Sequence, residues 1–123
     1  MINPIYNLPR INFVGGETQT FMFNLRTKEG NSFNANECEA EFALISYSGK
    51  NRDPVLTKDA NIVSDDYGLD SVASVSLNPS ETVNLHGKYI YQLTIRDKDG
   101  NIEIPGQGFV DIIRNIHPGF IIN

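Results

Sequence analysis

Residues 88–96 read Lys88-Tyr89-Ile90-Tyr91-Gln92-Leu93-Thr94-Ile95-Arg96, and this stretch decides the fold. Apolar residues stand at every second position from Tyr89 to Ile95, with mostly polar residues between them. Side chains alternate between the two faces of a strand, so the period of two predicts a β-strand with one buried face. β-branched and aromatic residues fill the run, as a half-buried pleated surface favours.

Three further runs show the same alternation and predict partner strands. Their expected inward residues are Phe21, Phe23 and Leu25 in residues 19–26, Cys38, Ala40, Phe42 and Leu44 in residues 38–47, and Ala73, Val75 and Leu77 in residues 71–77. Met22 is the exception in the first run, because it is apolar on the outward side. Residues 97–101 (Asp-Lys-Asp-Gly-Asn) predict a hairpin in which Gly100 takes a positive φ.

Helix signals are scarce. Asn78 followed by Pro79 is a typical helix start and predicts one turn within residues 78–85. Residues 105–108 contain one proline and two glycines, which predicts an edge, a bulge or a change of sheet before a last run at 109–116. Together these signals predict an all-β fold, an immunoglobulin-like antiparallel β-sandwich of about seven or eight strands with at most one short helical turn.

The residues just before the main strand have the shape of a tyrosine corner. Gly87 precedes Tyr89 by two positions, and Tyr89 begins the strand. In immunoglobulin-type sandwiches the corner tyrosine lies two residues before a core cysteine, and Tyr91 takes that cysteine's place here. The alternative is an ordinary strand that begins with tyrosine after a glycine turn.

Composition limits the classes of function. The 123 residues fit one domain, expected over residues 1–123, and the single cysteine excludes an internal disulfide. A net charge of −5 with scattered basic residues argues against nucleic-acid binding, which needs clustered Lys and Arg. No apolar run reaches the ~20 residues that span a bilayer, and the N-terminus lacks a signal-peptide pattern. We therefore expect a protein made in the cytoplasm, with no membrane partner.

Few residues suggest chemistry. The candidates are Cys38, His86, His117, the acidic cluster Asp65, Asp66 and Asp70, and the group Asp97, Asp99 and Asn101. Cys38 is expected on the core face, and the two histidines lack a second ligand at metal-binding spacing. The group around Gly100 fails the EF-hand pattern, since the twelfth position from Asp97 is Gly108. We expect no enzyme, no metal and no cofactor.

The two ends of the chain carry the candidate interface. Apolar arms are expected at residues 1–13 and 117–123, and the contact residues we select are Ile2, Ile5, Tyr6, Phe120, Ile121 and Ile122. One alternative is that these arms pack back on their own domain. The other is burial in a neighbouring subunit, because exposed apolar patches mark interfaces.

The second half of the chain resembles a known family. Its residues run Leu77-Asn78-Pro79-Ser80-Glu81, Gly87-Lys88-Tyr89-Ile90-Tyr91-Gln92-Leu93-Thr94-Ile95, Asp97-Lys98-Asp99-Gly100-Asn101 and Gly108-Phe109-Val110. This order is similar to the N-terminal domain of the baseplate upper protein of tailed phages and prophages of Gram-positive bacteria. Residues 15–21 also resemble the family's opening, so the resemblance spans about residues 12 to 116.

The resemblance implies an immunoglobulin-like sandwich and a structural role in a phage baseplate or tail tip, located in the virion and without catalysis. It implies other baseplate or tail proteins as partners, and rotational symmetry in tails implies a homo-oligomer. Family members usually continue into a coiled coil or a receptor-binding arm, whereas this sequence stops at Asn123, as a stand-alone subunit or a fragment would.

Two other functions remain open from the residues alone. A glycan-binding or adhesion module would need exposed aromatic platforms, for which Tyr47 and Tyr67 are the candidates. An enzyme would have Cys38 or the Asp65, Asp66 and Asp70 cluster at its centre.

Overall fold

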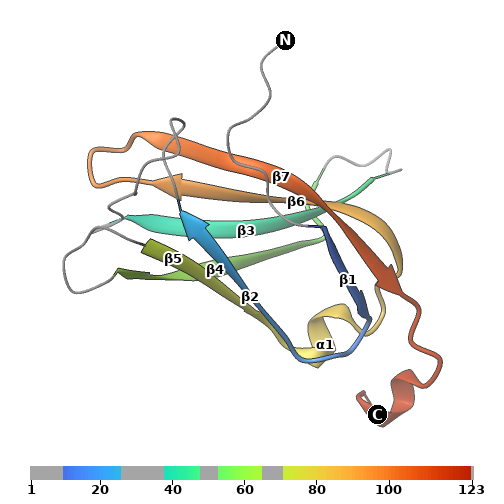
Figure 1. Cartoon of the computed structure of the whole chain (residues 1–123). Helices are drawn as coiled ribbons and strands as arrows, with labels where there is room; N and C mark the ends of the chain where they lie inside the picture. Colours follow the sequence, from blue (N-terminus) through green and yellow to red (C-terminus); the bar gives the residue numbers. More distant parts are fainter. Residues whose placement is uncertain (1–9, 26–37, 48–52, 65–70, 123) are drawn as a thin grey trace.

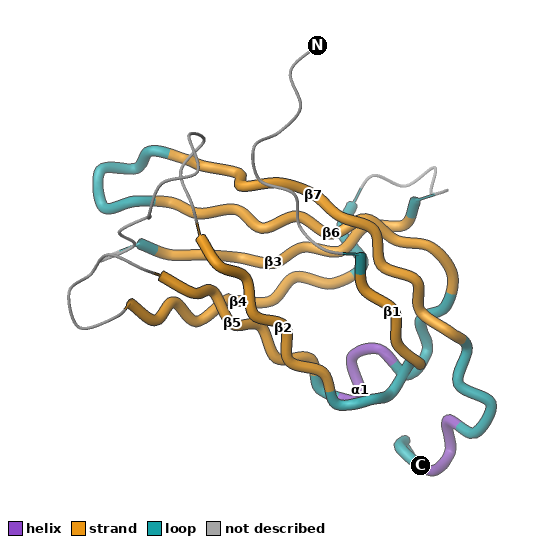
Figure 2. Tube along the Cα trace, viewed as in Figure 1, coloured by secondary structure: helices purple, strands orange, loops and turns teal. Residues whose placement is uncertain are grey.

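The structure is a computed structural model that describes residues 10–25, 38–47, 53–64 and 71–122. Within these ranges the strands are β1 (Ile11–Val14), β2 (Gln19–Leu25), β3 (Glu39–Ser46), β4 (Leu56–Ser64), β5 (Ser71–Leu77), β6 (Gly87–Arg96) and β7 (Ile102–Ile113). Helix in the described ranges is confined to α1 (Pro79–Thr82) and one 3₁₀ turn (Pro118–Phe120), as Figure 2 shows. The fold is therefore all-β, as the alternation predicted.

The strands form one hydrogen-bonded ladder in the order β1-β7-β6-β3-β4-β5-β2, which folds over into two layers (Figure 1). The change of layer occurs within β4. Its residues 56–60 pair with β3, and its residues 61–64 pair with β5. The first layer is thus β1, β7, β6 and β3, and the second is β5 and β2. This is the immunoglobulin-like sandwich that the sequence predicted, with the difference that β1 pairs in parallel with β7, so the pairing is mixed and not wholly antiparallel.

The core is a stack of aromatic rings between the layers. Tyr91 of β6 is fully buried, and its ring stacks on Phe23 of β2 and on Phe42 of β3 at 5.7 and 5.6 Å between centroids. In antibody domains a disulfide joins the two sheets beside a buried aromatic residue. Here stacked rings take that place, which explains how the sandwich holds together with one cysteine.

The inward faces of the strands follow the predicted alternation. Phe23, Leu25, Ala40, Phe42, Leu44, Ala73, Val75, Leu77, Tyr89, Tyr91, Leu93 and Ile95 are buried. Phe21 and Cys38 are partly buried and pack against this cluster, whereas Met22 points outward and is 69% exposed. The predicted faces of these four strands are therefore confirmed.

The tyrosine corner is also confirmed. The Tyr89 hydroxyl donates to the carbonyl oxygen of His86 at 3.1 Å and accepts from the His86 N–H at 3.2 Å. This bond to a backbone group just upstream is the mark of the motif. The hairpin at residues 97–101 is present as well, with Gly100 at φ 88°.

Strand β7 differs from the expected pair of segments, because it runs without interruption from Ile102 to Ile113. Between the partner pairs Leu93–Gly106 and Ile95–Glu103, β7 advances three positions and β6 only two, so β7 carries an irregularity at this point. Strand β1 pairs in parallel with β7 only from Val110 onward, which leaves the earlier half of β7 with β6 as its one neighbour among the described strands. The last run was expected to extend to residue 116, but β7 ends three residues earlier, at Ile113.

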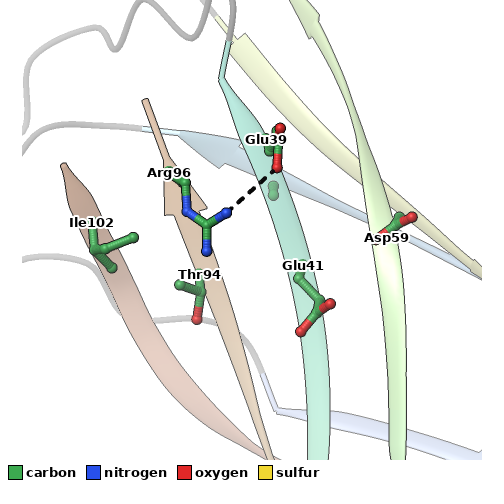
Figure 3. Close-up of a pocket in the computed structure, with 7 residues that line it drawn as sticks. Glu39, Glu41, Asp59, Thr94, Arg96 and Ile102 are labelled. Atoms are coloured by element: carbon green, nitrogen blue, oxygen red, sulfur yellow. Dashed lines mark ion pairs between the residues drawn. The ribbon is translucent and has the colours of Figure 1, made fainter. Parts of the chain in front are cut away.

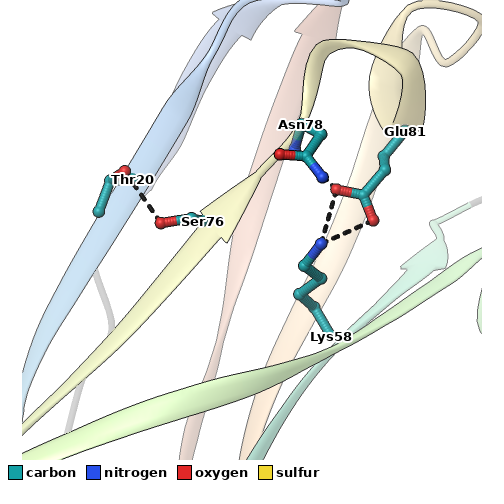
Figure 4. Close-up of polar contacts among 5 residues, drawn as sticks. All are labelled: Thr20, Lys58, Ser76, Asn78 and Glu81. Atoms are coloured by element: carbon teal, nitrogen blue, oxygen red, sulfur yellow. Dashed lines mark hydrogen bonds and ion pairs between the residues drawn. The ribbon is translucent and has the colours of Figure 1, made fainter.

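Polar contacts fasten α1 to the sheets. The Asn78 N–H donates to Glu81 Oε1 at 2.7 Å, and Lys58 of β4 donates to both Glu81 oxygens at 2.9 and 3.0 Å (Figure 4). The buried Thr82 hydroxyl accepts from the Gly16 N–H at 3.0 Å. These bonds hold the helical turn against both β4 and the turn that links β1 to β2.

Candidate functional site

The predicted terminal contacts are described in part. Ile2, Ile5 and Tyr6 lie outside the described residues. Phe120 is 83% exposed, and Ile122 is also exposed. Ile121 instead packs over Gly16, where an added Cβ would collide with its side chain. The C-terminal residues therefore combine one contact within the domain with an exposed ring.

The residues considered for catalysis are not brought together. Cys38 packs against the edge of the core, and His86 contributes its backbone to the tyrosine corner. Asp97 accepts hydrogen bonds from the Asn101 and Asp99 N–H groups, which lower the pKa of its carboxyl and hold the hairpin. The cluster Asp65, Asp66 and Asp70 lies outside the described residues. Within the described ranges, no three His, Cys, Asp or Glu side chains gather as metal ligands would.

An apolar row crosses the solvent-facing side of the first layer. Ile45 on β3 is in register with Ile90 on β6, which is in register with Phe109 on β7. Tyr47 and Val55 lie at the ends of β3 and β4 beside this row. Tyr47, Val55 and Phe109 are 55%, 47% and 40% exposed. We call the solvent-facing side of β7, β6, β3 and residues 56–60 the outer face.

Two cations stand over the aromatic rings at one end of the outer face. Tyr47 and Phe109 meet edge to face, with centroids 5.8 Å apart. The Lys88 ammonium lies 5.1 Å from the Tyr47 centroid and 5.5 Å from that of Phe109. Arg10 lies 5.6 Å from the Phe109 centroid and pairs with Asp111 at 2.6 Å. Such cation–π contacts hold both charges beside the apolar row.

The opposite end of the outer face is acidic. Glu41 on β3 is in register with Asp59 on β4 and with Thr94 on β6. Glu39 follows at the next outward position and lies 3.9 Å from Arg96 (Figure 3). These side chains line a shallow hollow of about 210 Å³. Three carboxylates against one guanidinium give this end a net negative charge.

A second hollow lies between the two ends. It measures about 160 Å³ and is lined by Ala43, Ile45, Pro54, Ile90, Gln92 and Gln107. Gln107 donates to the Gln92 amide oxygen at 2.7 Å, so these two amides bond each other across β6 and β7. The residues that line the centre of the outer face are therefore mostly apolar, and none of them is charged.

The sequence interpretation missed this surface. The signal was present, because Ile90 stands between Tyr89 and Tyr91, and Ile45 follows Leu44. Each of these apolar residues breaks a strand's polar outward side. Only the pairing register shows that the breaks lie at one level of neighbouring strands.

Comparison with known proteins finds matches among solved structures. Neither the protein-family models nor the curated proteins contain a match to this sequence. Among solved structures, CopC from Methylosinus trichosporium OB3b is 15% identical, with 86% of this chain and 85% of that chain covered and a TM-score of 0.41. The Lin-41 filamin domain is 19% identical, with coverages of 85% and 84% and a TM-score of 0.43. The fimbrial subunit AggA from Escherichia coli is 16% identical, with coverages of 85% and 90% and a TM-score of 0.40. Similarity at this level does not extend to function.

No helix in the described part of the chain is long and apolar enough to cross a membrane.

Proposed function

We propose that this protein is a structural component of a phage or prophage baseplate or tail tip, and that it acts through protein–protein contacts without catalysis. The outer face is the observation that carries the proposal. It presents a row of exposed and half-exposed apolar side chains, Ile45, Ile90 and Phe109, where alternation alone would place polar ones. Contiguous apolar surface with a polar rim is typical of protein interfaces.

The resemblance of residues 12–116 to the baseplate upper protein family supplies the context for this proposal. A rigid sandwich suits such a role, since both layers are fixed by the Phe23, Tyr91 and Phe42 stack. The outer face then lies on neighbouring strands that hold its side chains at fixed spacing. We expect such a surface to dock a partner without rearranging.

A glycan-binding module is the alternative, because Tyr47 is more than half exposed. Sugars stack on the open face of an aromatic ring. The ammonium of Lys88 lies over both Tyr47 and Phe109, so a cation stands over the rings that a sugar would contact. Tyr67 lies outside the described residues. The geometry therefore favours protein docking, and a glycan array that loses its signal on Tyr47→Ala would favour the alternative.

The virion role is tested on particles. Tailed particles are purified from a strain that encodes this chain, and an antibody against the chain is used for gold labelling in electron microscopy. The proposal predicts labels at the tail tip and the intact chain in the particle proteome. Particles that lack the chain would overturn the proposal.

A further inference from the structure

We infer that the outer face docks a second copy of this chain, face to face and with the strands of the two copies running in opposite directions. This inference rests on the proposed function, because it names the partner for the same surface. The two-fold axis that relates the copies would lie in the interface, perpendicular to the strands, and would cross β6 between the levels of Ile90 and Gln92. Such a two-fold arrangement makes every contact twice.

The charges favour this orientation. Lys88 and Thr94 are six residues apart on β6, so the basic and acidic ends are about 20 Å apart. If two copies met with their strands in the same direction, Lys88 would face Lys88 and the two acidic ends would lie together. In the opposite direction, Lys88 of one copy meets the level of Glu41 and Asp59 on the other. Only this orientation joins unlike ends, and juxtaposed like charges are strongly disfavoured at interfaces.

The shapes of the central side chains agree with the charges. With the axis between Ile90 and Gln92, Ile45 of one copy lies over Ala43 of the other, and the reverse contact follows by symmetry. A large side chain thus meets a small one at both places, while Ile90 and Phe109 meet the levels of Gln92 and Gln107 on the other copy. The hollow of about 160 Å³ lined by Ala43, Ile45 and Ile90 lies near the axis, where the second copy would fill it. Burial of the apolar row supplies the attraction, and the charged ends set the direction.

The symmetry allows a test that a different partner could not pass. Lys88→Glu puts a carboxylate at the level of the other copy's Glu41, and Glu41→Lys puts an ammonium at the level of the other copy's Lys88. Either change creates two like-charge contacts in a dimer, so each variant should fail to pair with itself. A mixture of the two variants forms a hetero-dimer in which the introduced carboxylate meets the introduced ammonium at one contact. The other contact keeps the original Lys88 and Glu41, so both contacts are then attractive.

The experiment is sedimentation equilibrium of the whole chain over a wide concentration range. We expect the wild type to approach twice its 13.7 kDa mass at high concentration. Each single variant should associate at least about ten-fold more weakly, and an equimolar mixture should return to within about three-fold of the wild type. Arg114→Glu and Asp99→Lys are the matched controls, because both residues are exposed and lie off the outer face. They should associate like the wild type, and thermal melting confirms that all variants fold.

Three outcomes would overturn the inference. These are a wild type that stays at 13.7 kDa at every concentration, single variants that associate normally, or a mixture that stays monomeric. The proposed function has a separate readout in gold-labelled particles. A monomeric chain at the tail tip would refute the second copy as partner and leave the virion role standing. A chain that forms the dimer but is absent from particles would refute the virion role and leave the second copy standing as partner.

Discussion

Gly108 on β7 lies directly across from Tyr91 on β6, and its missing side chain makes room for the tyrosine ring. A Cβ added to Gly108 would lie 2.6 Å from the Tyr91 hydroxyl oxygen. Tyr91 is completely buried, and burial raises the pKa of its hydroxyl. The largest side chain in the core therefore depends on the smallest residue of the neighbouring strand.

Replacement of Gly108 by alanine should destabilise the fold. The new methyl group overlaps the Tyr91 ring, and overpacking of this kind typically costs about 1–3 kcal/mol. Urea unfolding followed by circular dichroism measures the loss. Gly119→Ala is the control, because a Cβ there would meet no atom within 4 Å beyond its own local backbone and chain neighbours, so its stability should match the wild type. Equal midpoints for the two variants would contradict the close fit.

Truncation of a buried ring in the aromatic stack should lower the free energy of unfolding more than Gly108→Ala does. Tyr91→Ala or Phe42→Ala removes one member of the inter-layer stack and leaves a cavity, which typically costs about 3–5 kcal/mol. Tyr47→Ala removes a ring that is 55% exposed, so it should cost far less. Chemical denaturation compares the three, and unchanged midpoints for the core variants would mean that the strand faces are inverted.

The tyrosine corner gives a conservative test. Tyr89→Phe keeps the ring but removes the hydroxyl that bonds the N–H and carbonyl of His86. Loss of such a hydrogen bond costs about 0.5–1.5 kcal/mol, and more if the backbone groups stay dry. Tyr47→Phe is the matched control and should be neutral. A corner variant as stable as its control would show that these bonds do not stabilise the entry to β6.

Glu81 predicts a pH dependence. Hydrogen bonds from two groups hold the pKa of Glu81 below its ordinary value of about 4.5. The larger effect comes from the Asn78 N–H and the smaller from the Lys58 ammonium. A lowered carboxyl pKa stabilises the fold above the unfolded value, and this stability is lost as the pH falls through the folded value. Glu81→Gln should therefore lower the free energy of unfolding above about pH 5. The loss should be only about 1 kcal/mol, because the Lys58–Glu81 pair is partly exposed. The difference in stability from the wild type should shrink as the pH falls below about 4.5, and a difference that stays constant in acid would contradict this role.

The sequence predicted most of the fold because the inward residues of β2, β3, β5 and β6 alternate without interruption. It did not indicate β4, whose partly buried side includes Lys58 beside Leu56, Ala60 and Ile62. A charged residue there breaks the period of two. Its partner Glu81 lies on another element, so the pairing that makes Lys58 acceptable is visible only in three dimensions.

The candidate site could not be predicted in the same way. From the sequence, the predicted contacts lie at the two ends of the chain, at Ile2, Ile5, Tyr6, Phe120, Ile121 and Ile122. The apolar row instead depends on register, because Ile45 and Phe109 are far apart in sequence and meet only through Ile90. A single outward isoleucine carries no signal by itself, whereas three apolar side chains at one level of a sheet form a surface.

The measurement that tests the central claim most directly is the concentration dependence of isoleucine methyl signals in NMR. Ile45 and Ile90 lie on the outer face, Ile95 and Ile112 are buried, and Ile116 is 95% exposed elsewhere. If the outer face is where the protein assembles, the signals of Ile45 and Ile90 should shift as concentration rises. Those of Ile95, Ile112 and Ile116 should stay in place. Signals that never shift, or shifts confined to Ile116, would contradict the account.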